Sequence, residues 1–346
     1  EVVAHVLARP ESHEHAPQRR ATAFSEERPG VAGRTRAFVK VQDGCDNACT
    51  YCVVRLARGR QRSRPPEEVL ADVASRVAEG YREVVLTGVH IGAYGRDSAP
   101  GAPLPPESGW SLARLVREIL QRTPPARLRL SSVEPWDVTL DLLDLWQNPC
   151  LCRHVHLPLQ SGCDATLRRM GRRYTSSEFA QVVGELRRRV PEIAVTTDVI
   201  VGFPGETEAE FRASYAFIEE MAFTRLHVFR YSPRPGTPAA SAPDPVTTPV
   251  AQGRARALAR LGADLAQRYH QGLVGQEVLV LFETACRREG RIAWSGLTDT
   301  YVRVAASSEE ALGNRLARVH CEAADAAGVW GRIVAEPDGA EGPRGG

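Results

Sequence analysis

The stretch at residues 37–52, AFVKVQDGCDNACTYC, decides the fold of this 346-residue chain. Its first five residues are rich in β-branched and aromatic side chains and predict a strand. The strand runs into a loop that carries Cys45, Cys49 and Cys52 with the spacing C-x3-C-x2-C. Three soft thiolates this close together are typical of an iron–sulfur cluster or a zinc site. A structural zinc ion needs a fourth Cys or His, and the loop itself contains none; the first histidine after it is His90.

The spacing therefore favours a 4Fe–4S cluster with one iron left open, and zinc or plain buried thiols are the alternatives. An open iron can chelate the amino and carboxylate groups of S-adenosylmethionine (SAM), and one electron then releases a 5′-deoxyadenosyl radical. Tyr51 lies between two of the cysteines. We expect it to contact the adenine of SAM, with ordinary loop packing as the alternative.

Short apolar strands alternate with amphipathic helices after the cysteine loop. Such alternation predicts parallel strands joined by right-handed crossovers, and both doubly wound and barrel forms fit it. The predicted strands are residues 37–41, 83–86, 127–130, 154–157, 194–201 and 225–229, and the predicted helices are 66–79, 112–122, 139–147, 177–189 and 208–221.

Composition divides the chain into five segments. Polar residues 1–34 are expected to be a linker or the remnant of another domain, and residues 35–232 form the α/β domain. Residues 233–272 are a Pro/Ser-rich linker and a long helix. Residues 273–335 contain short strands broken by glycine and charge, which predicts a small β-barrel. The Gly/Pro-rich tail, 336–346, is expected to be disordered.

Charge and hydrophobicity place few limits on function. The net charge of +2 does not by itself indicate nucleic acid. No run of about 18 apolar residues predicts a membrane span, and the first residues do not resemble a signal peptide. We therefore expect a cytoplasmic protein whose eight cysteines are thiols or metal ligands rather than disulfides.

These motifs resemble the radical SAM methylthiotransferases, and most of all the subgroup that modifies N6-threonylcarbamoyladenosine in tRNA. The segment LTGVH at residues 86–90, followed by Tyr94 and Gly95, carries the resemblance to that subgroup. The other matching motifs are AFVKVQD at 37–43, RLSSVEP at 129–135, LPLQSG at 157–162, RRMGRRYT at 168–175, TDVIVGFPGET at 197–207 and YSPRPGTP at 231–238.

The resemblance implies a partial (β/α)6 TIM-type barrel with SAM at the carboxyl ends of the strands, followed by a TRAM-like RNA-binding β-barrel. It implies transfer of a methylthio group to C2 of the adenine at tRNA position 37. It further implies one 4Fe–4S cluster in this chain and a second in an N-terminal domain of which residues 1–34 would be the end. The expected partners are tRNA and an electron donor such as flavodoxin or ferredoxin, and the expected state is a monomer.

The resemblance, together with positions at the ends of predicted strands, suggests individual site residues. Asp198 lies inside an apolar strand, where a carboxylate needs a polar ligand or an arginine partner. The residues expected to bind SAM are Tyr51, Thr87, Gly88, His90, Ser132, Glu134, Gln160 and Asp198. The residues expected to bind RNA phosphates are Arg168, Arg169, Arg172, Arg173, Arg287, Arg288, Arg291 and Arg303, with a solvated surface as the alternative for the first four.

Two other functions remain open at this point. One is the same chemistry on isopentenyladenosine in tRNA or on a ribosomal protein. The other is a non-catalytic RNA-binding protein with a structural metal site. We expect the scattered cysteines, which include Cys150, Cys152 and Cys163, to be structural thiols rather than ligands of a second cluster.

Overall fold

The computed structural model describes residues 35–97, 103–288 and 291–335, so the expectations for residues 1–34 and 336–346 lie outside the described residues. Six parallel strands form the first domain, close to their predicted places. They are β1 (Arg36–Lys40), β4 (Glu83–Thr87), β5 (Arg127–Leu130), β6 (His154–His156), β7 (Ala194–Val201) and β8 (Arg225–Arg230). A short hairpin of β2 (Gln42–Asp43) and β3 (Arg62–Ser63), which was not predicted, flanks the cysteine loop.

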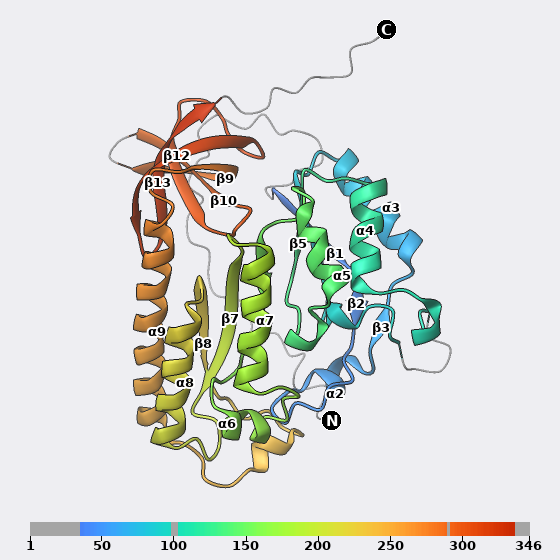
Figure 1. Ribbon diagram of the computed structural model, residues 1–346, viewed down its shortest axis with the longest axis vertical. Helices are drawn as coiled ribbons and strands as arrows, with labels where there is room; N and C mark the ends of the chain where they lie inside the picture. The colour runs from blue at the N-terminus through green and yellow to red at the C-terminus, as the bar shows by residue number, and fades with distance from the viewer. Residues whose placement is uncertain (1–34, 98–102, 289–290, 336–346) are drawn as a thin grey trace, which may run out of the picture.

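Helices connect the strands and cover the outside of the sheet (Figure 1). They are α2 (Val54–Arg58), α3 (Pro66–Ala78), α4 (Leu112–Arg122), α5 (Leu140–Leu143), α6 (Asp164–Arg169), α7 (Ser176–Arg189), α8 (Glu208–Met221) and α9 (Thr248–Gln271). Local sequence explains several starts. Ser111 caps α4, and Thr175 and Thr207 each form a capping box with the glutamate three residues on.

The single helix predicted at 139–147 is wrong in part. The α-helix stops at Leu143, and Asp144–Gln147 continues as a 3-10 turn. The buried Trp146 in this turn donates its indole N–H to the Cys152 carbonyl at 2.9 Å. This tertiary contact, which the local sequence does not reveal, accompanies the change of helix type.

The six strands lie side by side in chain order, as a partial barrel requires. Strands β1, β4 and β5 form one parallel sheet, and β6, β7 and β8 form another. Parallel bridges from Leu128 to Leu151 and from Ser132 to His156 join the two sheets. Within the described residues no pairing joins β1 to β8, so the barrel is open between them. This arrangement confirms the predicted partial barrel.

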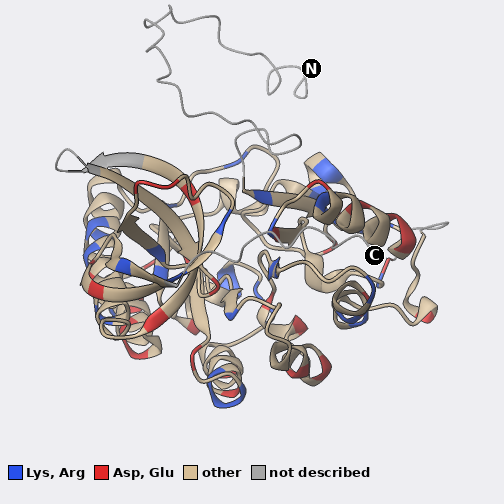
Figure 2. Ribbon diagram, turned by 90° about the horizontal axis from the view of Figure 1, so that it is seen from above, with Lys and Arg blue, Asp and Glu red and all other residues tan. Residues whose placement is uncertain are grey.

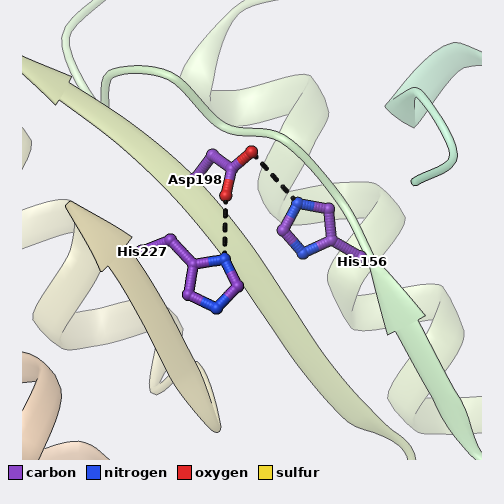
Figure 3. A group of neighbouring side chains, drawn as sticks. All are labelled: His156, Asp198 and His227. Carbon is purple, nitrogen blue, oxygen red and sulfur yellow. Dashed lines mark hydrogen bonds and ion pairs between the residues drawn. The ribbon is translucent and has the colours of Figure 1, made fainter. Parts of the chain in front are cut away.

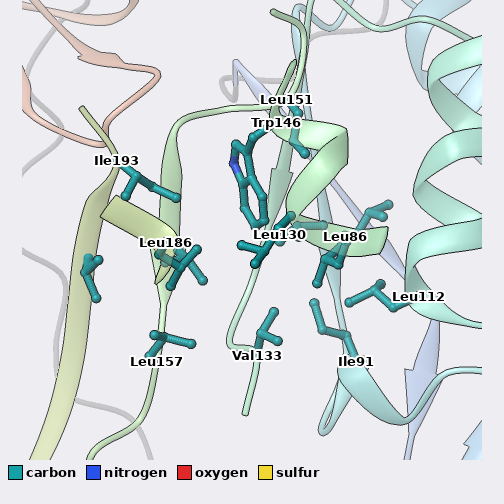
Figure 4. Packing of buried hydrophobic residues seen from close by; sticks show 14 of the residues in the cluster. Leu86, Ile91, Leu112, Leu130, Val133, Trp146, Leu151, Leu157, Leu186 and Ile193 are labelled. Atoms are coloured by element: carbon teal, nitrogen blue, oxygen red, sulfur yellow. The ribbon is translucent and has the colours of Figure 1, made fainter. Parts of the chain in front are cut away.

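A continuous apolar core holds the strands against the helices. Leu86, Leu130 and Leu157, from three successive strands or their ends, are buried together with Trp146 and Leu186 (Figure 4). Helix α9 also belongs to this core, because Leu258, Leu261 and Leu265 on one face of it are buried there. The segment predicted as a linker and helix is therefore, in its helical part, an integral layer of the first domain.

The predicted small β-barrel is also present. It contains β9 (Glu277–Arg288), β10 (Arg291–Thr298), β11 (Arg303–Ser307), β12 (Leu316–Asp325) and β13 (Gly328–Ala335). These strands close in the order β10-β11-β13-β12-β9. Phe282, Val304 and Val319 fill its separate apolar core.

The C-terminal barrel packs against the amino ends of the parallel strands. Arg129, buried within the short strand β5, pairs with the buried Glu83 at the start of β4 at 2.7 Å and donates to the Asp299 carbonyl at 2.9 Å. The Tyr301 ring lies 4.8 Å from the Arg129 guanidinium and stacks on His154 at 4.9 Å. The small barrel therefore sits at the opposite end of the first domain from the cysteine loop (Figure 1).

Charge is distributed over the described part of the chain without a single dominant sign. Basic and acidic positions are interspersed over the elements (Figure 2), in keeping with the net charge of +2. No helix among the described residues is both long and apolar enough to cross a bilayer.

Candidate functional site

The cysteine loop leaves β2 at the carboxyl end of the barrel and is fixed by close backbone contacts. Gly44 adopts a φ of 69°, and a side chain there would lie 2.0 Å from the Arg60 carbonyl. The Cys45 amide donates to the Gly59 carbonyl at 3.2 Å, and the Cys52 amide to the Cys49 carbonyl at 3.1 Å. Glycine is therefore required at position 44 for the loop to lie against the segment that follows α2.

The same loop is tied to the end of α6, far along the sequence. The Thr50 amide donates to the Met170 carbonyl at 3.0 Å, and the Thr50 hydroxyl to the Arg169 carbonyl at 2.8 Å. Gly171, with a φ of 70°, allows this approach, because a Cβ there would lie 2.9 Å from the Ala48 carbonyl. The cysteine loop thus has fixed neighbours on both sides.

The three cysteines fit an iron–sulfur cluster better than a zinc ion. All three are free thiols and partly exposed. A structural zinc ion takes four protein ligands, and the loop supplies three thiolates. Three thiolates suit a 4Fe–4S cluster that leaves one iron open.

His90 lies beside the first cysteine, as its position after β4 suggested. Its Nε2 lies 2.6 Å from Oδ2 of the buried Asp137, and its Nδ1 lies 4.0 Å from Cys45 Sγ. Burial works against the charged imidazolium, but the hydrogen bonds to Asp137 and Cys45 raise the pKa of His90 to about 9. Arg96 also pairs with Asp137. Sequence reasoning missed Asp137 and Arg96, which no motif singled out.

Arg172 is the clearest correction to the predicted site. It was expected to contact RNA phosphates, but its side chain is only 2% exposed and pairs with Glu134. Its Nη1 lies 3.5 Å from Cys49 Sγ, and its guanidinium lies over the Trp136 and Tyr174 rings. A buried, paired guanidinium is not available to an RNA backbone. Arg172 belongs instead to the surroundings of the cysteine loop, together with Glu134.

Tyr51 extends the loop into an apolar cluster at the carboxyl ends of β7 and β8. Its ring meets Phe203 edge-on at 6.3 Å, and it packs with Met170, Ile200 and Tyr231. A cavity of about 570 Å³ adjoins this cluster and is lined by residues of β8 and of the segments that follow β7 and β8. Tyr231 and Ala239 belong both to the lining of this cavity and to the apolar cluster.

A row of polar side chains crosses the inside of the barrel. Asp198 on β7 lies between His156 on β6 and His227 on β8 (Figure 3). Its Oδ2 is 3.3 Å from His156 Nε2, and its Oδ1 is 3.1 Å from His227 Nδ1. Burial opposes the charged carboxylate, but these two hydrogen bonds hold the pKa of Asp198 well below its usual value. The sequence predicted a polar ligand or an arginine as the partner of Asp198; the structure shows two histidines, and sequence reasoning missed both of them.

The remaining residues expected at SAM lie at carboxyl ends of strands. Thr87 ends β4, and Gly88 follows where a Cβ would lie 2.8 Å from the Gln42 carbonyl. Ser132 bridges to β6, and Gln160, with a φ of 65°, donates its amide to the Asp198 carbonyl at 2.8 Å. The structure brings these residues to one end of the barrel, and their contacts with SAM stay a prediction.

The other arginines expected at RNA have mixed surroundings. Arg168 and Arg173 are exposed, whereas Arg169 forms an ion pair with Glu210. Arg303 is half-exposed and donates to Ser295 at 3.0 Å beside a cavity of about 310 Å³ in the C-terminal barrel. The side chains of Arg287, Arg288 and Arg291 lie outside the described part of the structure. RNA binding by this set stays a prediction.

Comparisons with known proteins agree with this site. The model of the radical SAM superfamily matches residues 39–218. The chain is 40% identical over 311 residues to threonylcarbamoyladenosine tRNA methylthiotransferase MtaB of Thermotoga maritima, covering 89% of this chain and 68% of that protein. It is 39% identical to MtaB of Bacillus subtilis, covering 84% of this chain and 63% of that protein.

A relative with a different substrate in its name is similarly close. The chain is 40% identical over 274 residues to tRNA-2-methylthio-N(6)-dimethylallyladenosine synthase of Corynebacterium urealyticum, covering 77% of this chain and 50% of that protein. The chain thus spans between half and about two thirds of the length of these curated relatives. The matched family model, the identity to the Thermotoga protein and the three-cysteine loop show that this chain belongs to the radical SAM methylthiotransferase family and uses a 4Fe–4S cluster and SAM.

Proposed function

We propose that this chain is the SAM-cleaving and RNA-binding part of an enzyme that adds a methylthio group to C2 of N6-threonylcarbamoyladenosine at position 37 of tRNA. The observation that carries the proposal is the loop of Cys45, Cys49 and Cys52, held at the carboxyl end of an open barrel. When bound, a three-cysteine 4Fe–4S cluster and SAM supply a carbon radical that can abstract hydrogen from an unactivated C–H bond.

The chain's own residues prepare the site in three ways. Thr50 and Gly171 fix the loop against the end of α6. Arg172 places a positive charge and an N–H donor next to Cys49. Tyr51 packs with Phe203 and Met170 in an apolar cluster, which offers an adenine ring a hydrophobic surface to pack on. These features support a cofactor-binding end at which water is partly excluded.

The proposal also includes an electron donor, a sulfur source and a tRNA substrate. A small donor such as flavodoxin or ferredoxin would supply the electron, and the protein would act as a cytoplasmic monomer. Sulfur would come from a second cluster on an N-terminal domain. The relatives named for tRNA substrates support tRNA as the target, and the 40% identity to MtaB over 311 residues supports the threonylcarbamoyl nucleoside.

Anaerobic reconstitution tests the cofactor part of the proposal. We expect about four irons per chain and release of 5′-deoxyadenosine from SAM after reduction with dithionite. About eight irons would show that other cysteines hold a second cluster in this chain. A protein that binds zinc in place of iron and leaves SAM intact would favour the non-catalytic RNA-binding alternative.

Nucleoside analysis tests the substrate. In a strain that lacks the gene, mass spectrometry of tRNA digests should show loss of the 2-methylthio derivative of threonylcarbamoyladenosine and no loss of the dimethylallyl derivative. Loss of the 2-methylthio dimethylallyl derivative alone would indicate that the substrate is dimethylallyladenosine in tRNA.

A further inference from the structure

The overall identity does not choose the substituent on the adenine, because relatives named for two different nucleosides are each 40% identical to this chain. A threonylcarbamoyl group carries a carboxylate, a hydroxyl and an amide, whereas a dimethylallyl group is a hydrocarbon. A barrel that accepts one and rejects the other must present suitable chemistry where this group lies. The following inference rests on the proposed function and asks which side chains do so.

The row of His156, Asp198 and His227 lies inside the barrel at a defined depth. Thr196 on β7 pairs in register with His156 on β6, and Asp198 with His227 on β8. Side chains two residues apart on a strand share a face, so Asp198 faces the same side as Ile200. Because Ile200 packs in the apolar cluster of Tyr51, the row lies one two-residue step, about 7 Å, deeper in the barrel than that cluster.

Hydrogen bonds fix the orientation of this row. The Thr196 hydroxyl lies 2.9 Å from His156 Nδ1 and 3.0 Å from Nε2 of the buried His154. Both oxygens of Asp198 are engaged, one by each flanking histidine. An imidazole held through one nitrogen in this way presents its other nitrogen in a fixed direction. The row is therefore preorganised rather than mobile.

His227 is the member that remains accessible. Its side chain is 40% exposed, compared with 27% for Asp198 and 12% for His156. The structure gives a hydrogen bond to Nδ1 and, among the described residues, none to Nε2. Strand β8 is an edge of the open barrel, so His227 lies on a strand that borders the opening.

A metal ion is the obvious competing occupant. The three residues are the one group in the described ranges whose ligand atoms lie within 4.8 Å of one another. However, each oxygen of the Asp198 carboxylate already lies at hydrogen-bond distance from one imidazole nitrogen, so the carboxylate has partners without a cation. A substrate hydroxyl that donates a hydrogen bond to Nε2 of His227 requires no rearrangement of these contacts.

We propose that His227, oriented by Asp198, is a specificity-determining residue whose Nε2 accepts a hydrogen bond from the hydroxyl group of the threonylcarbamoyl substituent. A dimethylallyl group in the same place would displace water from His227 and Asp198 without forming a hydrogen bond to either residue. Burying polar groups without a partner costs free energy, so such a site disfavours an apolar substituent. These three polar side chains therefore disfavour binding of an apolar substituent on the adenine.

Binding of labelled anticodon stem-loops to the cluster-loaded protein with SAM tests this proposal without relying on turnover. The stem-loops carry threonylcarbamoyladenosine, dimethylallyladenosine or unmodified adenosine at position 37. We expect the wild-type protein to bind the threonylcarbamoyl form at least about tenfold more tightly than the dimethylallyl form. The variant His227→Leu should bring this ratio close to one, and His227→Gln should retain part of it.

The matched control is Arg225→Ala, which removes an exposed side chain two residues earlier on the same strand. It should keep the wild-type ratio. Iron content and circular dichroism establish that each variant is folded and loaded, and His227→Gln serves as the second variant if the leucine variant is not.

Three results would count against the proposal, and they are distinguishable. An unchanged ratio in His227→Leu would overturn the role of His227 and leave the proposed function intact. A wild-type protein that binds no stem-loop would overturn the proposed function itself. A metal ion bound in addition to the cluster iron, and lost in His227→Leu, would assign the row to a cation and overturn substrate recognition.

Discussion

The buried guanidinium of Arg172 forms an ion pair with the Glu134 carboxylate, and its Nη1 lies 3.5 Å from Sγ of Cys49, a predicted cluster ligand. Hydrogen bonds to cluster sulfurs and local charge set the potential of iron–sulfur clusters. Two neighbouring arginines therefore differ sharply in their expected roles, because Arg173 is exposed whereas Arg172 is buried.

The variant Arg172→Met should make the midpoint potential of the cluster more negative, since it removes an N–H donor and a positive charge. It should also destabilise the protein by about 3 kcal/mol, because Glu134 loses its partner in a largely buried place. Redox titration followed by electron paramagnetic resonance and urea unfolding measure the two effects. The control Arg173→Met should change neither, and an unchanged potential in Arg172→Met would contradict the assignment.

Replacing Cys49 by alanine should abolish stable cluster binding, because only two cysteine ligands would then remain in the loop. The iron content after reconstitution should fall from about four per chain to well below one. The control is Cys163→Ala, which removes a partly exposed thiol outside the loop. If the Cys163 variant lost iron as the Cys49 variant does, the assignment of ligands would be wrong.

His90 should make the stability of the cluster-free protein depend on pH. Its pKa is raised to about 9 in the folded state, above the usual value of about 6.5. The resulting stabilisation is fully present below about pH 6.5 and is lost as the pH rises through about 9, and it amounts to about 3 kcal/mol. Urea unfolding at pH 6 and pH 10 should show a larger loss for the wild type than for His90→Asn. Equal losses would argue that His90 is neutral throughout.

The ion pair between Arg129 and Glu83 should hold the two domains together as well as stabilise the barrel. Arg129→Met leaves the fully buried Glu83 carboxylate with a weaker partner and removes the donors to the carbonyls of Thr298 and Asp299. We expect a loss of about 3–5 kcal/mol and faster proteolytic release of the C-terminal barrel. The exposed Arg117 provides the control, since Arg117→Met should change stability by less than about 0.5 kcal/mol.

The parts of the fold that depend on short-range patterns could be predicted from the sequence. Strand β7 has its predicted bounds, Ala194–Val201, because valine, isoleucine and threonine fill all its positions except Ala194 and Asp198, as is typical of a buried parallel strand. The cysteine loop was readable for the same reason, since its three ligands lie within eight residues. Helix 139–147 was predicted less well, because the Trp146 contact with Cys152 is tertiary.

The parts of the site that depend on long-range pairing could not be read in this way. Arg172 lies in RRMGRRYT, where four arginines look alike, and the burial of this one follows from the turn at Gly171 and from Glu134, 38 residues earlier. His156 and His227 lie 71 residues apart, and only the register of β6, β7 and β8 brings both to Asp198. Charge and residue type alone do not reveal such partners.

The C-terminal barrel lies at the amino ends of the parallel strands, so the first domain separates it from the cysteine loop at the carboxyl ends. Helix α9 contains 24 residues and runs along the first domain toward that barrel (Figure 1), a length of about 36 Å at 1.5 Å per residue. An RNA that touches both Arg303 and the cysteine-loop end must span a comparable distance. If the predicted RNA contacts at both ends are real, a nucleic acid shorter than about 36 Å would reach only one of the two ends at a time.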